Sequence, residues 1–402
     1  MRKDQAFVIV LLAVFLCATG LSADAGKNEI LPLSEVKKGM VGYGLTVFEG
    51  DTIEKFDVVI EGVLHNIGPQ QDLILARVDS EVIRRAGVVA GMSGSPIFID
   101  GKVIGALAYS WQFAKDPIAG ITPIEEMLRL DQPSNGGGKP TGATITSREF
   151  LDTVIKREPE AAFEKLLTSF SSRTTLASAG ALPIATPLSF SGFAPETIER
   201  FGRVLEASGF LAVPSGSSGS SGSSPASAAG PFKAGDAVGA VLVDGDFSLA
   251  ATGTVTHVDG KRVYGFGHPF LDIGEIEFTM AKSEIVTVMA SLARSFKFSN
   301  TGEVVGTLKQ DRSAGIFGHL GETTEMIPIE ITMNGSTGPQ TYRLRAVRHH
   351  QLFPLIMALA TDSVVSAAQR SSGERTVILD SEIKVIGFAP IRLHDGWAGP
   401  QA

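Results

Sequence analysis

One short stretch of small residues, Gly91-Met92-Ser93-Gly94-Ser95-Pro96, decides how the rest of this sequence is interpreted. It is followed by an apolar, strand-like run, Ile97 to Ile99, and by the turn Asp100-Gly101. A serine between glycines on a tight turn keeps its hydroxyl uncrowded, and the glycines let backbone N–H groups point at one spot. Acyl transfer by a serine needs both features, an accessible oxygen and donors for the oxyanion. The alternative is a plain glycine-serine turn between two strands, since a short motif is only a hypothesis.

A candidate base lies far downstream, in Tyr264-Gly265-Phe266-Gly267-His268-Pro269-Phe270. The histidine follows a predicted strand over residues 261–264 and is flanked by glycine and proline. A lone histidine is usually structural. A serine nucleophile, however, needs a base to accept its proton, so Ser93 and His268 support each other as a catalytic pair.

The pattern G-x-S-G-x-P around Ser93 resembles the one that chymotrypsin-like serine peptidases place around their nucleophile. With the histidine included, the chain resembles the SpoIVB (sporulation stage IV protein B) family of serine peptidases, which has a chymotrypsin-like catalytic domain. Residues 91–96 match the family's G-M-S-G-S-P stretch, and residues 264–268 match its G-A-L-G-H stretch more loosely. Residues 305–318 resemble the family's strand pair ending in G-I-x-G. The resemblance covers roughly residues 30–130 and 235–320.

The resemblance implies a catalytic triad and an oxyanion hole. Ser93 aligns with the nucleophile and His268 with the base. Asp79, one residue closer to the serine than the family's aspartate, would orient the imidazole. The N–H groups of Gly91 and Ser93 would face the oxyanion.

Three residues compete for these roles. Asp272, four residues after the histidine, and Asp72 are alternative acids, although a turn or surface carboxylate is the favoured interpretation of each. Ser95 competes with Ser93 as the nucleophile, and the G-x-S pattern favours Ser93.

The chain order of the motifs departs from that of the family. There the order is histidine, aspartate, serine within one continuous domain, whereas here it is Asp79, Ser93, His268. We expect a circular permutation or an exchange of halves, which a triad tolerates because geometry and roles define it. Permutation is feasible where the original termini lie close together. The PDZ module of that family is not evident, so the resemblance leaves the substrate open.

Composition sets the class of protein. The 402 residues can hold two or three domains, and 44% hydrophobic with 19% charged residues indicates a globular chain. With 45 glycines and 23 phenylalanines, the sequence favours short strands and many turns. The net charge of −8 and the lack of a basic stripe make nucleic acid an unexpected partner. Together with the resemblance to the SpoIVB peptidases, which implies the type of barrel, this leads us to expect a mainly β fold: a chymotrypsin-like double β-barrel in permuted order, with a helical insert and a C-terminal α+β extension.

The N-terminus predicts a signal peptide over residues 1–25. Arg2 and Lys3 precede an apolar run, 6–18, and Ala23-Asp24-Ala25 fits a cleavage site. The run is short for a transmembrane span, and an uncleaved anchor is the alternative. The single cysteine, Cys17, lies inside this run, so the mature protein would hold no disulfide. We expect export to the periplasm or the extracellular space and leave membrane proximity open.

The remaining boundaries follow from changes in composition. The expected units are a serine half of the peptidase domain (26–131), a helical insert (143–213), a disordered Ser/Gly linker (214–231), a histidine half (232–325) and a C-terminal α+β or sandwich-like extension (326–402). Within the insert, residues 194–208 form an amphipathic pattern that begins at Pro195-Glu196 and ends before Gly209, which predicts a helix.

The sequence therefore predicts an exported serine endopeptidase that acts on proteins or peptides. The alternatives are a catalytically dormant binding or scaffold protein on a peptidase fold and an esterase that uses the same residues. No cofactor is expected, and no metal, because the adjacent pair His349-His350 lacks acids at ligand spacing. Four isolated histidines are interpreted as structural: His65, His257, His319 and His394. The oligomeric state is left open.

Overall fold

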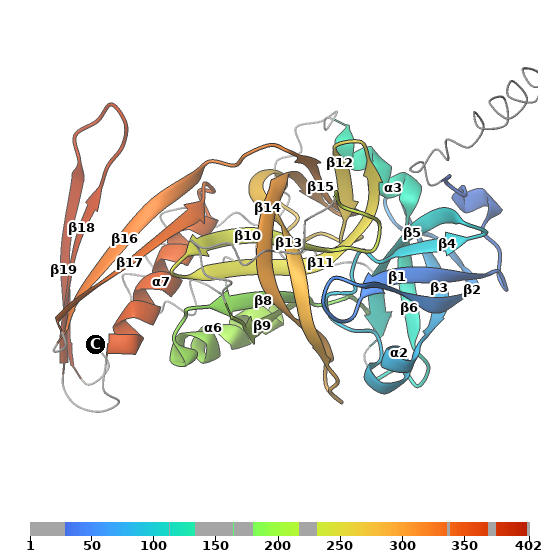
Figure 1. Ribbon diagram of the computed structural model, residues 1–402, viewed down its shortest axis with the longest axis horizontal. Helices are drawn as coiled ribbons and strands as arrows, with labels where there is room; N and C mark the ends of the chain where they lie inside the picture. Colours follow the sequence, from blue (N-terminus) through green and yellow to red (C-terminus); the bar gives the residue numbers. More distant parts are fainter. Residues whose placement is uncertain are drawn as a thin grey trace, which may run out of the picture.

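The structure is a computed structural model that describes residues 29–111, 113–132, 164, 180–216, 231–335, 338–368 and 375–399. The expected signal peptide over residues 1–25 lies outside the described residues, as do most of the linker and the first part of the helical insert. Strands dominate the described chain (Figure 1).

The first half of the chain folds into a closed antiparallel barrel of six strands. Its strands follow one another in space in the order β4-β1-β2-β3-β6-β5, and a further pairing of β4 with β5 closes the ring. Their bounds are β1 Val41–Val47, β2 Ile53–Gly68, β3 Gln71–Asp79, β4 Pro96–Ile99, β5 Lys102–Trp111 and β6 Ile118–Pro123. The apolar alternation along β2 explains which face turns inward, because Phe56, Val58 and Ile60 are buried while the residues between them are exposed.

The second half forms another closed ring of six strands, in the order β10-β13-β14-β15-β12-β11, with β10 pairing to β11. Their bounds are β10 Ala237–Gly245, β11 Ser248–Asp259, β12 Arg262–Gly265, β13 Gly274–Met289, β14 Phe296–Arg312 and β15 Gly315–Leu320. Two six-stranded antiparallel barrels side by side are consistent with the chymotrypsin-like fold expected from the sequence, so the predicted fold class is confirmed. The barrel that carries Ser93 precedes the barrel that carries His268 in the chain.

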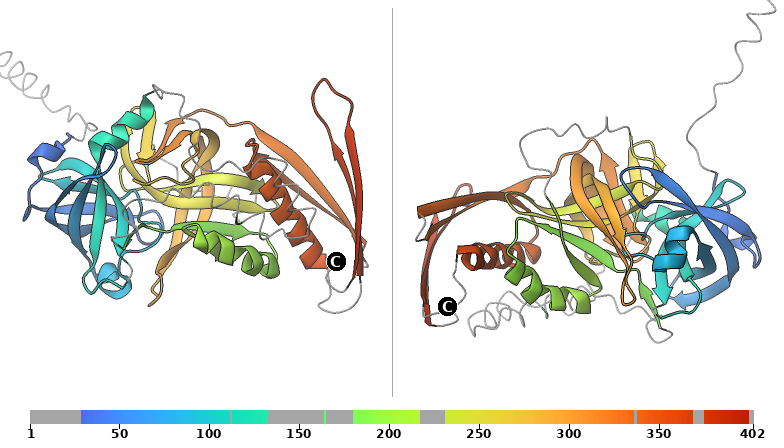
Figure 2. Two further views of the ribbon diagram at one scale, coloured as in Figure 1. Left: turned by 180° about the vertical axis from the view of Figure 1, so that it is seen from behind. Right: turned by 60° about the horizontal axis from the view of Figure 1, so that its bottom comes forward.

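Additional strands extend the second sheet beyond its ring. On one side β17 (Gly338–Val347) pairs with β10 and with β16 (Met326–Gly335); on the other, β8 (Thr186–Ser191) pairs with β11 and with β9 (Phe210–Pro214). The C-terminal segment is therefore partly continuous with the second barrel. The hairpin of β18 (Arg375–Ile383) and β19 (Ile391–Gly399) is a separate two-stranded sheet at the end of the molecule opposite the first barrel (Figures 1 and 2).

Helices cover the ends and one side of this β framework. Their bounds are α2 Glu81–Ala86, α3 Ile124–Leu128, α6 Pro195–Ala207 and α7 Leu352–Ala368, with short 3-10 turns at Leu33–Glu35 and Arg129–Asp131. α6 buries Phe201 and Leu205 and lies beside α7, where Thr197 Oγ1 donates a 2.6 Å hydrogen bond to Asp362. The described part of the expected helical insert thus contains one helix and three strands, including β7 (Ala181–Pro183), which pairs with β5 of the first barrel.

Candidate active site

The glycine-serine stretch is a tight turn between α2 and β4. Gly91 and Gly94 both have left-handed backbone, with φ of 94° and 93°, which favours glycine. The two serines of the turn differ in their contacts. The Ser95 hydroxyl donates to the Met92 carbonyl at 2.7 Å, whereas the buried Ser93 Oγ has no hydrogen-bond partner among the described residues. Ser93 is therefore the hydroxyl of this turn that is not held in a local hydrogen bond.

The second barrel holds the turn from the opposite side, through β11. Thr254 N–H donates to the Ser93 carbonyl at 2.8 Å, and the Thr254 hydroxyl donates to the Gly91 carbonyl at 3.1 Å. The Thr256 hydroxyl donates to the Gly94 carbonyl at 2.7 Å. Three carbonyls of the turn therefore bind β11. The N–H groups of Gly91 and Ser93, by contrast, donate no hydrogen bond to any described residue. An oxyanion hole requires N–H donors of this kind, close to the serine and not bound to another acceptor.

This docking has a consequence that the sequence analysis did not predict. The Ser93 side chain was expected to be uncrowded, but Ser93 is 0% exposed. The reason is long-range: the second barrel packs directly on the turn, and local sequence carries no signal for that contact. A hypothetical Cβ on Gly94 would lie 2.0 Å from the Thr254 carbonyl oxygen and 2.4 Å from the Phe266 nitrogen.

His268 is positioned by the turn that follows β12. Phe266 and Gly267 have positive φ values of 67° and 70°, which turn the chain toward the first barrel. There the Gly267 carbonyl accepts a 2.5 Å hydrogen bond from the Thr122 hydroxyl. A Cβ at Gly267 would meet the Ala106 side chain at 2.8 Å, so glycine allows this close approach to β5.

The imidazole of His268 is in the protonation state that a general base needs. It is 2% exposed, and its Nδ1 hydrogen-bonds with the Pro269 carbonyl at 2.8 Å. Burial lowers the His268 pKa to about 4, although the carbonyls of Pro269 and Ile184 act in the opposite direction. The ring is therefore neutral near pH 7, and a carbonyl at Nδ1 places the proton there. Nε2 then carries the lone pair, and it has no hydrogen-bond partner among the described residues.

The structure brings the two motifs together but forms no hydrogen bond between their side chains. The backbone of Gly94 packs on Phe266, and both segments border β5, where Gly94 N–H donates to the Leu107 carbonyl at 2.8 Å. Ser93 Oγ and His268 Nε2 are both buried and both unpartnered. Catalytic hydrogen bonds are often long or poorly aligned without substrate, so the lack of this hydrogen bond does not by itself exclude the pair.

Neither Asp79 nor Asp72 has a hydrogen bond to His268 of the kind a triad requires. Asp79, at the end of β3, binds Arg84 at 2.8 Å, and its side chain is 46% exposed. Asp72 accepts a hydrogen bond from the Asn66 N–H at 2.8 Å. Asp272 follows the histidine in a turn with φ of 56°. Because the Pro269 carbonyl occupies Nδ1, the orienting role of Asp79 stays a prediction without a supporting contact.

A buried carboxylate that the sequence analysis missed fixes the backbone after the histidine. Asp311, on β14, is 0% exposed and accepts hydrogen bonds from the N–H groups of Phe270 at 2.7 Å and Leu271 at 2.6 Å. Burial raises the Asp311 pKa to about 7, and the two N–H donors oppose that rise. The neighbouring residues Lys309, Gln310 and Arg312 are also polar, so the local sequence gives no signal that Asp311 is buried.

A buried lysine, also missed, packs under the serine turn. Lys297 is 0% exposed, its alkyl chain would contact a Cβ on Gly91 at 3.2 Å, and its Nζ donates to the Thr46 hydroxyl at 2.8 Å. Burial lowers the Lys297 pKa to about 7, while Glu54 acts to raise it. The backbone of the same segment pairs with the turn, because Lys297 N–H donates to the Ala90 carbonyl at 3.1 Å.

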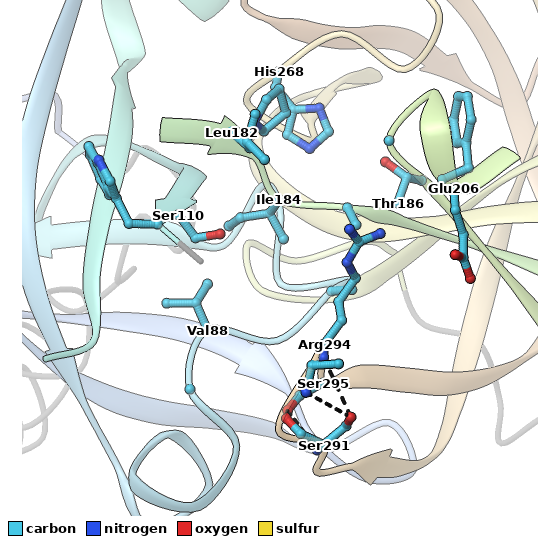
Figure 3. Close-up of a pocket in the computed structure, with 18 of the residues that line it drawn as sticks. Val88, Ser110, Leu182, Ile184, Thr186, Glu206, His268, Ser291, Arg294 and Ser295 are labelled. Carbon is cyan, nitrogen blue, oxygen red and sulfur yellow. Dashed lines mark hydrogen bonds between the residues drawn. The ribbon is translucent and has the colours of Figure 1, made fainter. Parts of the chain in front are cut away.

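A cleft of about 470 Å³ opens between the barrels next to His268. Figure 3 shows its walls: Val88 and Ser110 come from the first barrel, and Arg294 comes from the turn between β13 and β14. Leu182 and Ile184, in and just after β7, lie between Ser110 and the imidazole. Ser93 does not line the cleft, in keeping with its burial.

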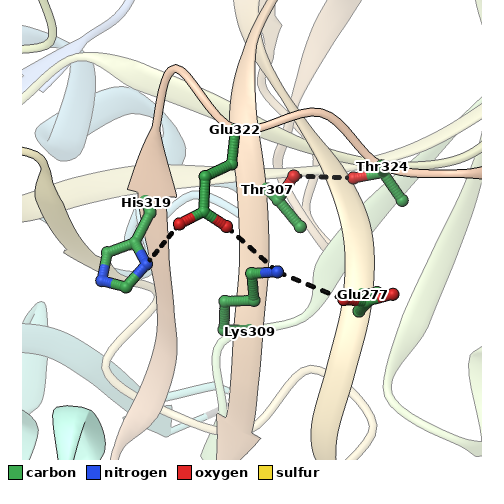
Figure 4. A network of polar contacts seen from close by, with 6 residues as sticks. All are labelled: Glu277, Thr307, Lys309, His319, Glu322 and Thr324. Atoms are coloured by element: carbon green, nitrogen blue, oxygen red, sulfur yellow. Dashed lines mark hydrogen bonds and ion pairs between the residues drawn. The ribbon is translucent and has the colours of Figure 1, made fainter.

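The other histidines make local contacts away from this cleft. His319 is part of a surface network in which Glu322 binds both its Nδ1 at 3.0 Å and Lys309 at 3.0 Å (Figure 4). His394 pairs with Asp380 at 2.6 Å. Within the described ranges, no group of three or more histidine, cysteine or acidic side chains is arranged to hold a metal ion.

Comparison with known proteins shows that the segment of the first barrel is similar to a peptidase family. Residues 22–128 match the family model described as SpoIVB peptidase S55. No curated protein and no solved structure matches the chain. The predicted resemblance to the SpoIVB peptidases is therefore confirmed for the segment that carries Ser93, and the match indicates a peptidase. It ends before His268, so it does not bear on the exchanged order of the halves.

Among the described residues, no helix combines the length and the apolar character that a membrane span requires.

Proposed function

We propose that this chain is an exported serine endopeptidase in which Ser93 is the nucleophile and His268 is the general base. One observation carries the proposal. Ser93 Oγ and His268 Nε2 are buried, unpartnered polar atoms on two segments that dock against each other between the barrels. A buried polar atom without a hydrogen bond is unfavourable, and such atoms concentrate at functional sites. That the serine lies in the segment matched to a peptidase family supports the same interpretation.

The proposed reaction begins with proton transfer from Ser93 Oγ to His268 Nε2 as the oxygen attacks a peptide carbonyl. The N–H groups of Gly91 and Ser93 stabilise the oxyanion, and loss of one such donor typically raises the barrier by about 2.7–4 kcal/mol. His268 then returns the proton to the leaving amine. In the second stage His268 takes a proton from water as the water attacks the acyl-enzyme, and it returns that proton to Ser93 Oγ as the acyl–oxygen bond breaks and the acid product leaves. Asp79 is retained as the proposed acid of the triad, in an arrangement that frees His268 Nδ1 from Pro269.

The proposed location follows from the N-terminal sequence. Arg2 and Lys3, the apolar run 6–18 and the small residues 23–25 are typical of a signal peptide that is cleaved before Gly26. Mass determination of the protein recovered from the periplasm or the medium tests this, with a mature chain that begins at Gly26 as the expected result. Recovery of the full-length chain from the membrane fraction contradicts it.

Covalent labelling by a fluorophosphonate tests the catalytic assignment. We expect the wild-type protein and Ser95→Ala to be labelled, and Ser93→Ala and His268→Ala to be unlabelled. Ser95 is a matched control because it lies in the same turn and is equally buried. Cleavage of an unstructured protein such as casein should follow the same pattern, and a parallel assay on a simple ester separates a peptidase from an esterase.

A second candidate function is a dormant scaffold on a peptidase fold. The 0% exposure of Ser93 and the absence of a hydrogen bond from it to His268 favour this alternative. A well-folded protein that is labelled at no serine, and that cleaves neither protein nor ester, would support the scaffold.

A further inference from the structure

Along one edge of β5, the serine turn and residues 181–184 bind at successive positions. Pro96 of β4 pairs with Ala106, and the next residue of β5, Leu107, exchanges hydrogen bonds with the turn: its N–H donates to the Ser95 carbonyl at 2.9 Å and its carbonyl accepts from Gly94. At the following residue, Ala108, the carbonyl accepts a 2.8 Å hydrogen bond from Ile184 N–H.

The contact continues along β5 as an antiparallel strand. Tyr109 is opposite Pro183, Ser110 is opposite Leu182, and Trp111 is opposite Ala181. Residues 181–184 therefore lie extended on β5, and their last member sits one position from the residue that binds the serine turn. An extended peptide bound to a sheet edge gains main-chain hydrogen bonds for affinity and pockets for alternate side chains.

The side chains of this segment contact the site itself. Ile184 is 2% exposed and packs into the core of the first barrel, whereas Leu182 is 38% exposed at the cleft. Figure 3 draws both beside the imidazole of His268. The Ile184 backbone, like that of Pro269, acts to raise the pKa of His268 by hydrogen bonding. The Ile184 carbonyl is thus next to His268, and the Ile184 N–H binds the residue of β5 that follows the one bound to the serine turn.

We propose that residues 181–184 occupy the binding site of a peptide substrate and hold the enzyme in a latent state. The inference rests on the proposed function, since it assigns the β5 edge as the substrate strand's partner. It accounts for the burial of His268, which is 2% exposed and borders the same cleft as Leu182 and Ile184. It also defines the substrate class: an extended segment with aliphatic residues at the positions of Leu182 and Ile184.

Weakening the occupant tests the proposal by the rate of fluorophosphonate labelling. We expect Leu182→Asp and Ile184→Gly to be labelled at least about tenfold faster than wild type. Val41→Ala is the control, because Val41 is an exposed aliphatic residue on another strand of the same barrel, and its labelling rate should equal that of wild type. Ile184 is a core residue, so a thermal melt of each variant checks that it is folded. Leu182 is partly exposed, so Leu182→Asp still tests the proposal if Ile184→Gly fails to fold.

A binding measurement separates failure of this inference from failure of the proposed function. A fluorescein-labelled Ala-Leu-Pro-Ile peptide should bind the double variant Ser93→Ala/Leu182→Asp at least about tenfold more tightly than Ser93→Ala alone, whatever the chemistry. Equal labelling of wild type and both variants overturns the latent state while the peptidase stands. If no protein is labelled, the peptidase assignment is wrong, and the peptide measurement alone tests the occupied site. Tighter binding of the peptide to the double variant then supports occupation by residues 181–184, and equal or absent binding overturns it.

Discussion

The packing of the serine turn on the second barrel makes Gly94→Ala the most informative single substitution. Gly94 has φ of 93°, and a Cβ there would lie 2.0 Å from the Thr254 carbonyl oxygen and 2.4 Å from Phe266 nitrogen. Both neighbours are backbone atoms, so neither can rotate away, and the two barrels must separate locally. Gly101 supplies a matched control, since its φ is 78° and a Cβ there would meet nothing within 4 Å.

The magnitude follows from the difference between these two glycines. Left-handed backbone at alanine costs roughly 1–2 kcal/mol, and both variants carry that term. Overpacking adds about 1–3 kcal/mol or more, and only Gly94→Ala carries it. We expect Gly101→Ala to lower the free energy of unfolding by about 1–2 kcal/mol and Gly94→Ala by about 1–3 kcal/mol or more beyond that.

Denaturant titrations followed by circular dichroism measure both variants. Fluorophosphonate labelling of the folded proteins gives the second readout, and we expect it to be lost in Gly94→Ala and kept in Gly101→Ala. Equal losses of stability in the two variants, with labelling kept in both, would refute the direct docking of the turn on Thr254 and Phe266.

Three further predictions concern the buried ionisable groups. The Lys297 pKa is about 7 in the folded protein and 10.5 in an unperturbed lysine, so the unfolded chain binds more protons between these values. Wild-type stability should therefore rise by about 2 kcal/mol relative to Lys297→Met from pH 7 to 9, since one pKa unit corresponds to about 1.4 kcal/mol; a parallel pH dependence of the two proteins contradicts this. The His268 pKa is about 4 when folded, so the unfolded chain binds more protons below pH 6.5, and the wild type should lose stability relative to His268→Gln as the pH falls from 6.5 to 4 in thermal melts. Asp311→Asn removes one acceptor from the Phe270 and Leu271 N–H groups, and denaturant titration should show a loss of about 1–3 kcal/mol together with slower labelling; unchanged labelling would separate Asp311 from the positioning of His268.

Elements with a strong local pattern were predictable. The helix expected over residues 194–208 is observed as Pro195–Ala207, because an amphipathic face, an initial proline and Gly209 after its end all agree. The resemblance carried by residues 91–96 predicted a chymotrypsin-like double barrel.

Features that depend on contacts between remote segments were not predictable. The burial of Ser93 results from β11 packing on its turn, and Thr254 lies over 150 positions away in the chain. Lys297 and Asp311 lie in strands where alternation predicted apolar or exposed residues, and only the assembled barrels show that both are buried. The pairing of residues 181–183 with β5 likewise has no local signal, since three residues are too few for a periodic pattern.

A crystal structure of the protein after reaction with a fluorophosphonate tests the account most directly. The account predicts a phosphorus atom bound to Ser93 Oγ, a phosphoryl oxygen facing the N–H groups of Gly91 and Ser93, and His268 Nε2 within about 2.6–3.2 Å of an oxygen of the adduct. A folded protein in which the reagent sits on another serine, or in which the His268 ring points away from a modified Ser93, would contradict it.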